Sequence, residues 1–167
     1  PKAWIVREGD DRRKPTAYPD FPNPESRTVV LHPRPEQDGV GALVLSHRGE
    51  QGIRSLVDDV KFTGKELATN DDSPNRLLFT TPILEKPMHI SGIPRVQIRV
   101  ASSRPAANLS VWLVSLPWAK SARKMTENII TRGWADPQNH SSLTESEPLV
   151  EDQFYELNFD LQPDDQI

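Results

Sequence analysis

The chain has 167 residues, which suits a single domain of ordinary size with its own core. It contains no cysteine, so a disulfide framework, a thiolate metal site and a thiol nucleophile are all excluded. The formal net charge of −4, from 20 basic and 24 acidic residues, gives no electrostatic footprint for nucleic acid. No apolar run reaches the roughly 18 residues that a membrane-spanning helix needs. We therefore expect neither nucleic acid nor a membrane as a partner.

The beginning of the chain has no targeting signal. Pro1–Arg7 has neither the apolar core nor the cleavage site of a signal peptide, and it lacks a starting methionine. We therefore expect the chain to be a piece of a longer polypeptide. A cysteine-free composition is compatible with the cytosol and also leaves secretion open, and we expect a cytoplasmic protein.

Prolines divide the chain into short segments. Four of them lie within residues 15–24, so this stretch is expected to run extended across the surface, anchored by Tyr18 and Phe21. We assign residues 1–30 to an extended, proline-rich N-terminal segment of the domain. Residues 31–167 are assigned to a single β-sandwich.

Alternating apolar and polar residues predict the strands, because successive side chains of a strand point to opposite faces. Two strands are expected at 27–32 and 40–45, around a turn over Pro33–Gly39, and residues 47–61 are ambiguous. Further strands are predicted at 76–80, 88–92, 94–102, 108–116, 128–132 and 155–161. The segments 94–102 and 108–116 are interpreted as half of one sandwich sheet, and Gly133-Trp134 as the end of the strand before it.

The pattern as a whole favours an antiparallel all-β fold, a jelly roll or β-sandwich with little helix. The side chains expected in its core are those of the two segments with the clearest alternation, Val96, Ile98, Val100, Tyr155, Leu157, Phe159 and Leu161.

No set of residues predicts an active site. Ser46 and His47 lack the glycines of a nucleophile elbow, and neighbouring strand residues point to opposite faces. The histidines His32, His89 and His140 have no metal-ligand spacing, and we interpret each as exposed or hydrogen-bonded. For the acidic pairs Asp58-Asp59, Asp71-Asp72 and Asp164-Asp165, turn capping and solubility are favoured over calcium binding. We predict no catalytic residue, no metal and no cofactor.

Four tryptophans could form a platform for stacking sugars, or could fill the core and interfaces as large rings commonly do. Trp118 follows Pro117 in a predicted loop and is the strongest candidate for exposure.

An ordered series of short motifs resembles a known domain. It consists of Asn75-Arg-Leu-Leu-Phe-Thr-Thr-Pro82, His89-Ile-Ser-Gly-Ile-Pro-Arg-Val96, Arg104-Pro-Ala-Ala-Asn-Leu-Ser110, Ile129-Ile-Thr-Arg-Gly-Trp134, Leu143 and Tyr155-Glu-Leu-Asn-Phe-Asp-Leu-Gln-Pro163. In this order the motifs are similar to the C-terminal domain of Xaa-Pro dipeptidyl-peptidases and of related cocaine-esterase-like acyl hydrolases. The similarity covers residues 74 to 163 clearly and the first 73 residues weakly.

The resemblance implies a jelly-roll β-sandwich of galactose-binding-like type, appended to an α/β-hydrolase catalytic domain of the same polypeptide. That domain carries the serine, aspartate and histidine of the family, and none of its motifs is in this chain. The chain departs from the family in having Tyr18-Pro19 where a Trp-Pro pair is common. The family domain also continues beyond the equivalent of Ile167, so either unassigned strands complete the sandwich or a sheet edge stays open.

Three functions remain open. The first is a non-catalytic domain that packs on the catalytic domain of a serine hydrolase, a dipeptidyl-peptidase or an acyl esterase, and shapes its active-site entrance. The second is a carbohydrate-binding module of the galactose-binding-like class, and the third is a purely structural sandwich. The candidate interface or ligand aromatics are Tyr18, Phe21, Trp118 and Trp134. An open edge would also favour a homo-oligomer.

Overall fold

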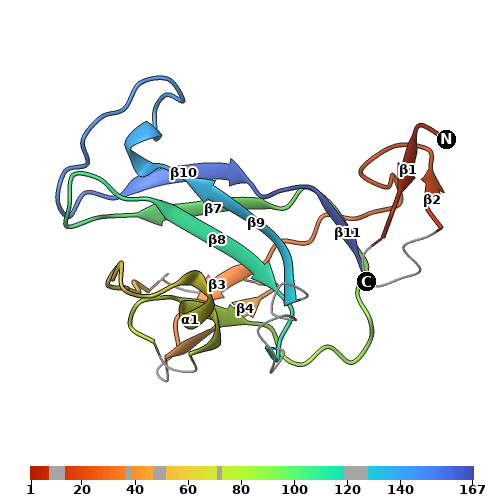
Figure 1. The fold of residues 1–167 in the computed structure, drawn as a ribbon, viewed down its shortest axis with the longest axis horizontal. Coiled ribbons are helices and arrows are strands. Elements are labelled where there is room, and N and C mark those ends of the chain that lie inside the picture. The colour runs from red at the N-terminus through yellow and green to blue at the C-terminus, as the bar shows by residue number, and fades with distance from the viewer. Residues whose placement is uncertain (8–13, 37–38, 47–51, 71–72, 119–127) are drawn as a thin grey trace. The chain divides into compact units, whose positions relative to one another are not determined.

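The computed structural model describes residues 1–7, 14–36, 39–46, 52–70, 73–118 and 128–167, and within them the chain is almost entirely β (Figure 1). The helical elements among these residues are short: α1, Gly64–Thr69, and a 3-10 helix, Pro137–Asn139. The strands are β1 Ala3–Ile5, β2 Thr16–Tyr18, β3 His32–Arg34, β4 Val40–Val44, β5 Leu78–Thr80, β6 Ile90–Gly92, β7 Arg95–Val100, β8 Leu109–Val114, β9 Ile129–Ala135, β10 Tyr155–Asp160 and β11 Asp164–Gln166.

The chain forms two compact units. One combines residues 1–26 with residues 89–167, and the other consists of residues 27–88. Residues 1–26 of the proline-rich N-terminal segment therefore belong to the unit that holds β6 to β11, and they contain the β1–β2 hairpin, which the sequence did not predict. The division of the chain at residue 30 stays a prediction.

The central ladder of the larger unit joins β7 and β10, the two segments with the clearest alternation. Its register places Val100 opposite Tyr155, Ile98 opposite Leu157, and Val96 opposite Phe159. One face is therefore apolar, and the other carries exposed polar pairs such as Arg95 and Asp160, 2.8 Å apart. Tyr155, Leu157 and Leu161 of the predicted core are buried, whereas Val96, Ile98, Val100 and Phe159 are half-buried.

β7 and β8 do not share a sheet, so the interpretation of 94–102 and 108–116 as half of one sheet is wrong. β8 pairs instead with β9. The connection between β7 and β8 is hydrogen-bonded to a distant part of the chain: the carbonyl of Pro105 accepts a hydrogen bond from the amide of Leu149 at 2.9 Å. That contact ties the connection to the loop before β10.

β9 lies against the chain that follows β10, and this contact requires a glycine. A Cβ atom on Gly133 would lie 2.8 Å from Leu161 Cδ2 and 2.9 Å from the carbonyl oxygen of Asp160. The Thr131 hydroxyl donates to the carbonyl of Gln162 at 2.6 Å. β9 therefore continues through Gly133 and Trp134, where the sequence predicted its end.

The smaller unit contains a three-stranded sheet in the order β3–β4–β5. β4 and β5 run parallel, an exception to the predicted antiparallel arrangement. The strand predicted at 27–32 is wrong except for His32, because β3 begins there and extends through Pro33. A proline without a donor is tolerated at this position because β3 is an edge strand. The helix α1 begins with a capping box in which the side chains of Thr63 and Glu66 bond each other's backbone amides.

The predicted all-β class with little helix is confirmed, and the arrangement is consistent with a β-sandwich. The jelly-roll topology stays a prediction.

Replacing Leu157 by alanine tests the central ladder. We expect the free energy of unfolding to fall by about 2 to 5 kcal/mol, because the substitution leaves a cavity beneath β10. Its neighbour Asn158 lies on the exposed face of the same strand, and Asn158→Ala should cost no more than about 0.5 kcal/mol. Urea unfolding measures both, and equal effects of the two variants would contradict the assignment of faces.

Candidate functional site

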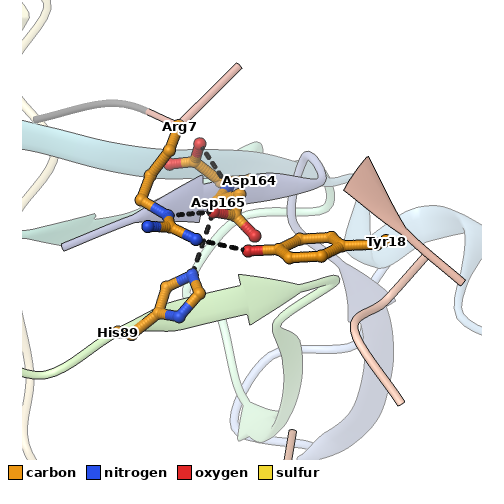
Figure 2. Close-up of polar contacts among 5 residues, drawn as sticks. All are labelled: Arg7, Tyr18, His89, Asp164 and Asp165. Carbon is orange, nitrogen blue, oxygen red and sulfur yellow. Dashed lines mark hydrogen bonds and ion pairs between the residues drawn. The ribbon is translucent and has the colours of Figure 1, made fainter. Parts of the chain in front are cut away.

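Among the described residues of the larger unit, the most deeply buried carboxylate belongs to Asp165, at the centre of β11. Its side chain is 2% exposed. The Nε of Arg7 donates to Oδ1 of Asp165 at 3.1 Å, and Nε2 of His89 lies 2.9 Å from the same oxygen. Figure 2 shows the carboxylate between the guanidinium and the imidazole. The residues come from three places in the chain: Arg7 follows β1, His89 directly precedes β6, and Asp165 lies in β11.

Tyr18 completes this group, which we name the Asp165 cluster (Arg7, Tyr18, His89 and Asp165). Arg7 Nη2 donates to the Tyr18 hydroxyl at 2.6 Å (Figure 2). Tyr18 ends β2 and is 6% exposed, so its side chain is buried within this unit. Because the hydroxyl is hydrogen-bonded to the Arg7 guanidinium, the polar end of the side chain does not need water and the ring can be buried.

Opposing effects set the pKa of Asp165. Burial raises the pKa, because the protein interior disfavours the charged form. The nearby Ser91 hydroxyl and the hydrogen bonds of His89 and Arg7 lower it and together prevail, so the pKa lies below the ordinary value of 3.8. The carboxylate is therefore ionised at neutral pH.

The arrangement fastens together segments of the chain that are far apart in the sequence. The Asp165 carboxylate forms ion pairs with Arg7 and, when its ring is protonated, with His89. Turn capping, predicted for the pair Asp164-Asp165, is wrong for Asp165, which lies in a strand and binds a distant arginine. His89 was predicted to be exposed or hydrogen-bonded, and it is hydrogen-bonded. No sequence pattern singles out Arg7, because its partner lies 158 residues away.

The remaining candidate aromatics differ in their exposure. Phe21 and Trp118 are half-buried, and the Nε1 of Trp118 is buried without a hydrogen-bond partner among the described residues. Trp134 is 55% exposed and lies within strand β9. The guanidinium of Arg132 lies 5.3 Å from its ring centroid. Their role as interface or ligand residues stays a prediction.

The other candidates bring no chemistry together in the residues that the structure describes. Ser46 is exposed just after β4, while His47 and the pair Asp71-Asp72 lie outside those residues. No group of three or more histidine or acidic side chains in the described ranges could hold a metal ion. The described helices are also too short and too polar to cross a membrane.

Replacing Asp165 by asparagine tests the cluster by removing the charge while keeping the shape. We expect the free energy of unfolding near neutral pH to fall by about 1 to 3 kcal/mol, because Arg7 loses a charged partner. The folded-state pKa lies below the unfolded one, so this contribution is fully present above about pH 4 to 5. It is lost as the pH falls through the folded-state pKa, so the two proteins should then unfold alike. Urea unfolding across this pH range measures the difference.

Asp20→Asn is the matched control, because Asp20 pairs with Lys2 at 2.9 Å on the open surface. Exposed ion pairs contribute little to stability, so this variant should unfold like the parent. A loss for Asp20→Asn equal to that for Asp165→Asn would show that the burial of the Asp165 cluster has no special effect.

Comparisons with known proteins all indicate the same family. Residues 1–166 match the family described as the X-Pro dipeptidyl-peptidase C-terminal non-catalytic domain. A "Putative Xaa-Pro dipeptidyl-peptidase" of Rhodopirellula baltica is 53% identical over 167 residues, covering 99% of this chain and 27% of that protein. A protein of the same name from Bacillus anthracis is 37% identical over 127 residues, covering 75% of this chain and 20% of that protein. An Xaa-Pro dipeptidyl-peptidase of Lacticaseibacillus rhamnosus is 26% identical over 181 residues, covering 89% of this chain and 23% of that protein.

No solved structure matches the chain significantly. The chain spans about a quarter of the length of the curated relatives that it matches. The family match extends over nearly all of it, including the β1–β2 hairpin and the Asp165 cluster. The chain therefore belongs to the family of X-Pro dipeptidyl-peptidase C-terminal non-catalytic domains.

Proposed function

We propose that this chain is the accessory domain of a serine hydrolase that removes Xaa-Pro dipeptides, and that it packs on the catalytic domain of the same polypeptide. Two findings support the proposal: the family is described as non-catalytic, and the relatives, which are named dipeptidyl-peptidases, are about four times as long as the chain. The names favour a peptidase over an acyl esterase. Docked there, the domain would shape the entrance to the active site.

The observation that carries the proposal is the large number of exposed apolar side chains. Among the residues that the structure describes, more than half of the large ones lie between residues 27 and 88, and many of these are in segments outside any strand. Val60 is 92% exposed and Ile83 is 95% exposed. We define the apolar set as the members of this group that lie within residues 29–31, 53–62 and 83–88. They are Val29, Val30, Leu31, Ile53, Leu56, Val57, Val60, Phe62, Ile83, Leu84 and Met88.

Single exposed apolar residues are normal, but this many within about 60 residues favour a covering partner. Each Å² of apolar surface removed from water contributes about 25 cal/mol. A specific interface of ordinary size buries roughly 1,600 Å² in total, and its core is more apolar than its rim. A domain attached to the same chain is the partner that needs the least additional affinity, because tethering raises its effective concentration. A second copy of the chain is the competing partner.

The carbohydrate-binding alternative keeps one supporting observation, the exposed ring of Trp134 beside Arg132. A flat aromatic ring with a neighbouring hydrogen-bond donor suits a sugar. It leaves the apolar set unexplained, so we favour the docking function.

Cysteine labelling tests the docking. Val60→Cys or Ile83→Cys introduces the only thiol of the chain. We expect a maleimide to modify either thiol about tenfold more slowly in the full-length polypeptide than in the 167-residue chain, because docking covers the apolar set. Mass spectrometry of the labelled peptide gives the rates. Glu25→Cys, at an exposed polar position, is the control and should react equally fast in both proteins. Equal rates at Val60 and Ile83 in the two proteins would contradict the docking.

A second test concerns catalysis. The 167-residue chain alone should not hydrolyse an Xaa-Pro anilide or an acyl ester, because no nucleophile elbow is present in its sequence. The full-length polypeptide should hydrolyse the anilide. If the isolated chain were active and Ser46→Ala abolished that activity, the chain would carry its own active site and the proposed function would be wrong.

A further inference from the structure

The loop of residues 136–154, between β9 and β10, presents a leucine to solvent. Leu143 is 96% exposed, the highest value among the large apolar residues that the structure describes. In Figure 1 this loop rises from the ends of the strands as a blue arc at the upper left. An exposed leucine is unremarkable by itself. The construction of the loop around it is what requires an explanation.

The tip of the loop is built around the side chain of Asn139. Its Nδ2 donates to the carbonyls of Ser142 and Glu145, at 3.1 and 3.2 Å, and its Oδ1 accepts from the Ser146 hydroxyl at 3.0 Å. These bonds bracket Leu143 on both sides. The tip therefore has a defined conformation that does not depend on burying the leucine.

The base of the loop is bound to the rest of the unit. The backbone amide of Val150 donates to the Tyr155 hydroxyl at 2.9 Å, and the ring of His140 lies 4.5 Å from the ring of Tyr155, centroid to centroid. The amide of Ala107 donates to the Gln138 side chain at 2.8 Å. A side chain held on such a preorganised loop loses little conformational entropy when it binds, which favours affinity.

The loop is also strongly acidic. It contains no lysine or arginine, and its carboxylates belong to Asp136, Glu145, Glu147, Glu151 and Asp152. In the described part of the chain, none of these carboxylates forms an ion pair with a lysine or arginine. An apolar tip framed by carboxylates complements an apolar pocket framed by positive charge.

We propose that Leu143 is an anchor residue that inserts into an apolar pocket, rimmed by lysine or arginine, on the catalytic domain of the same polypeptide. This inference rests on the proposed function. It adds a second contact with the catalytic domain, besides the contact made by the apolar set. A second copy of the chain is a poorer partner, because its net charge is also −4 and it would bring the same acidic loop. The tethered catalytic domain needs only a small additional contact, because its effective concentration is about millimolar.

The experiment extends the labelling series to Leu143→Cys. We expect the thiol at residue 143 to react with a maleimide about tenfold more slowly in the full-length polypeptide than in the 167-residue chain. Asn139→Ala in the same background removes the bonds that hold the tip, so part of this protection should be lost. Unfolding of the isolated chain should be the same for Leu143→Cys and the parent, since the leucine makes no core contact.

Protection at Val60 and Ile83 without protection at Leu143 would overturn the anchor and leave the proposed function standing. Absence of protection at all three positions would overturn both. Protection at Leu143 that grows with the concentration of the isolated chain would identify a second copy as the partner and overturn the anchor on the catalytic domain.

Discussion

The ladder between β7 and β10 positions the rest of the larger unit. Two-stranded sheets are only marginally stable in water unless one face is covered, and every sheet described in this unit has two strands. The apolar face of the ladder meets this requirement through Leu157 and Tyr155. Leu161, directly after β10, then passes so close to Gly133 that β9 is held against the ladder, and the hydrogen bond from Thr131 to Gln162 secures the contact.

Few of the described side chains in the resulting core are fully buried. No large side chain among the described residues is less than 2% exposed, and the buried set includes polar residues such as Thr131, Asn128 and Asp165. The conformation of the domain is therefore held largely by specific hydrogen bonds and ion pairs, and less by continuous apolar packing. Such bonds define a geometry well but contribute modestly to net stability. A domain of this kind gains considerably when another surface covers it, which agrees with the docking that we propose.

Prediction from sequence succeeded where period-two alternation is strong and failed where strands are short and polar. β7, β8 and β10 were predicted because their apolar faces are regular, but β11, Asp164–Gln166, has no apolar residue in a periodic pattern. The partner of a strand is not encoded locally, so β8 was assigned to the wrong neighbour. The Asp165 cluster joins residues far apart in sequence and could not be predicted. The capping box of α1 was readable in the motif Thr63-Gly-Lys-Glu66 and was missed.

The ion pair between Arg7 and Asp165 also governs the order in which the domain can mature on the ribosome. These residues are separated by 158 positions. At about 5 to 20 residues per second, synthesis supplies the carboxylate roughly 8 to 30 seconds after the guanidinium. During that interval the β1–β2 hairpin has neither its ion pair nor the strand that carries it, and Tyr18 has no buried environment. The first strands of this domain to be made are therefore among the last to become stable, and the domain depends on late docking of its N-terminal segment.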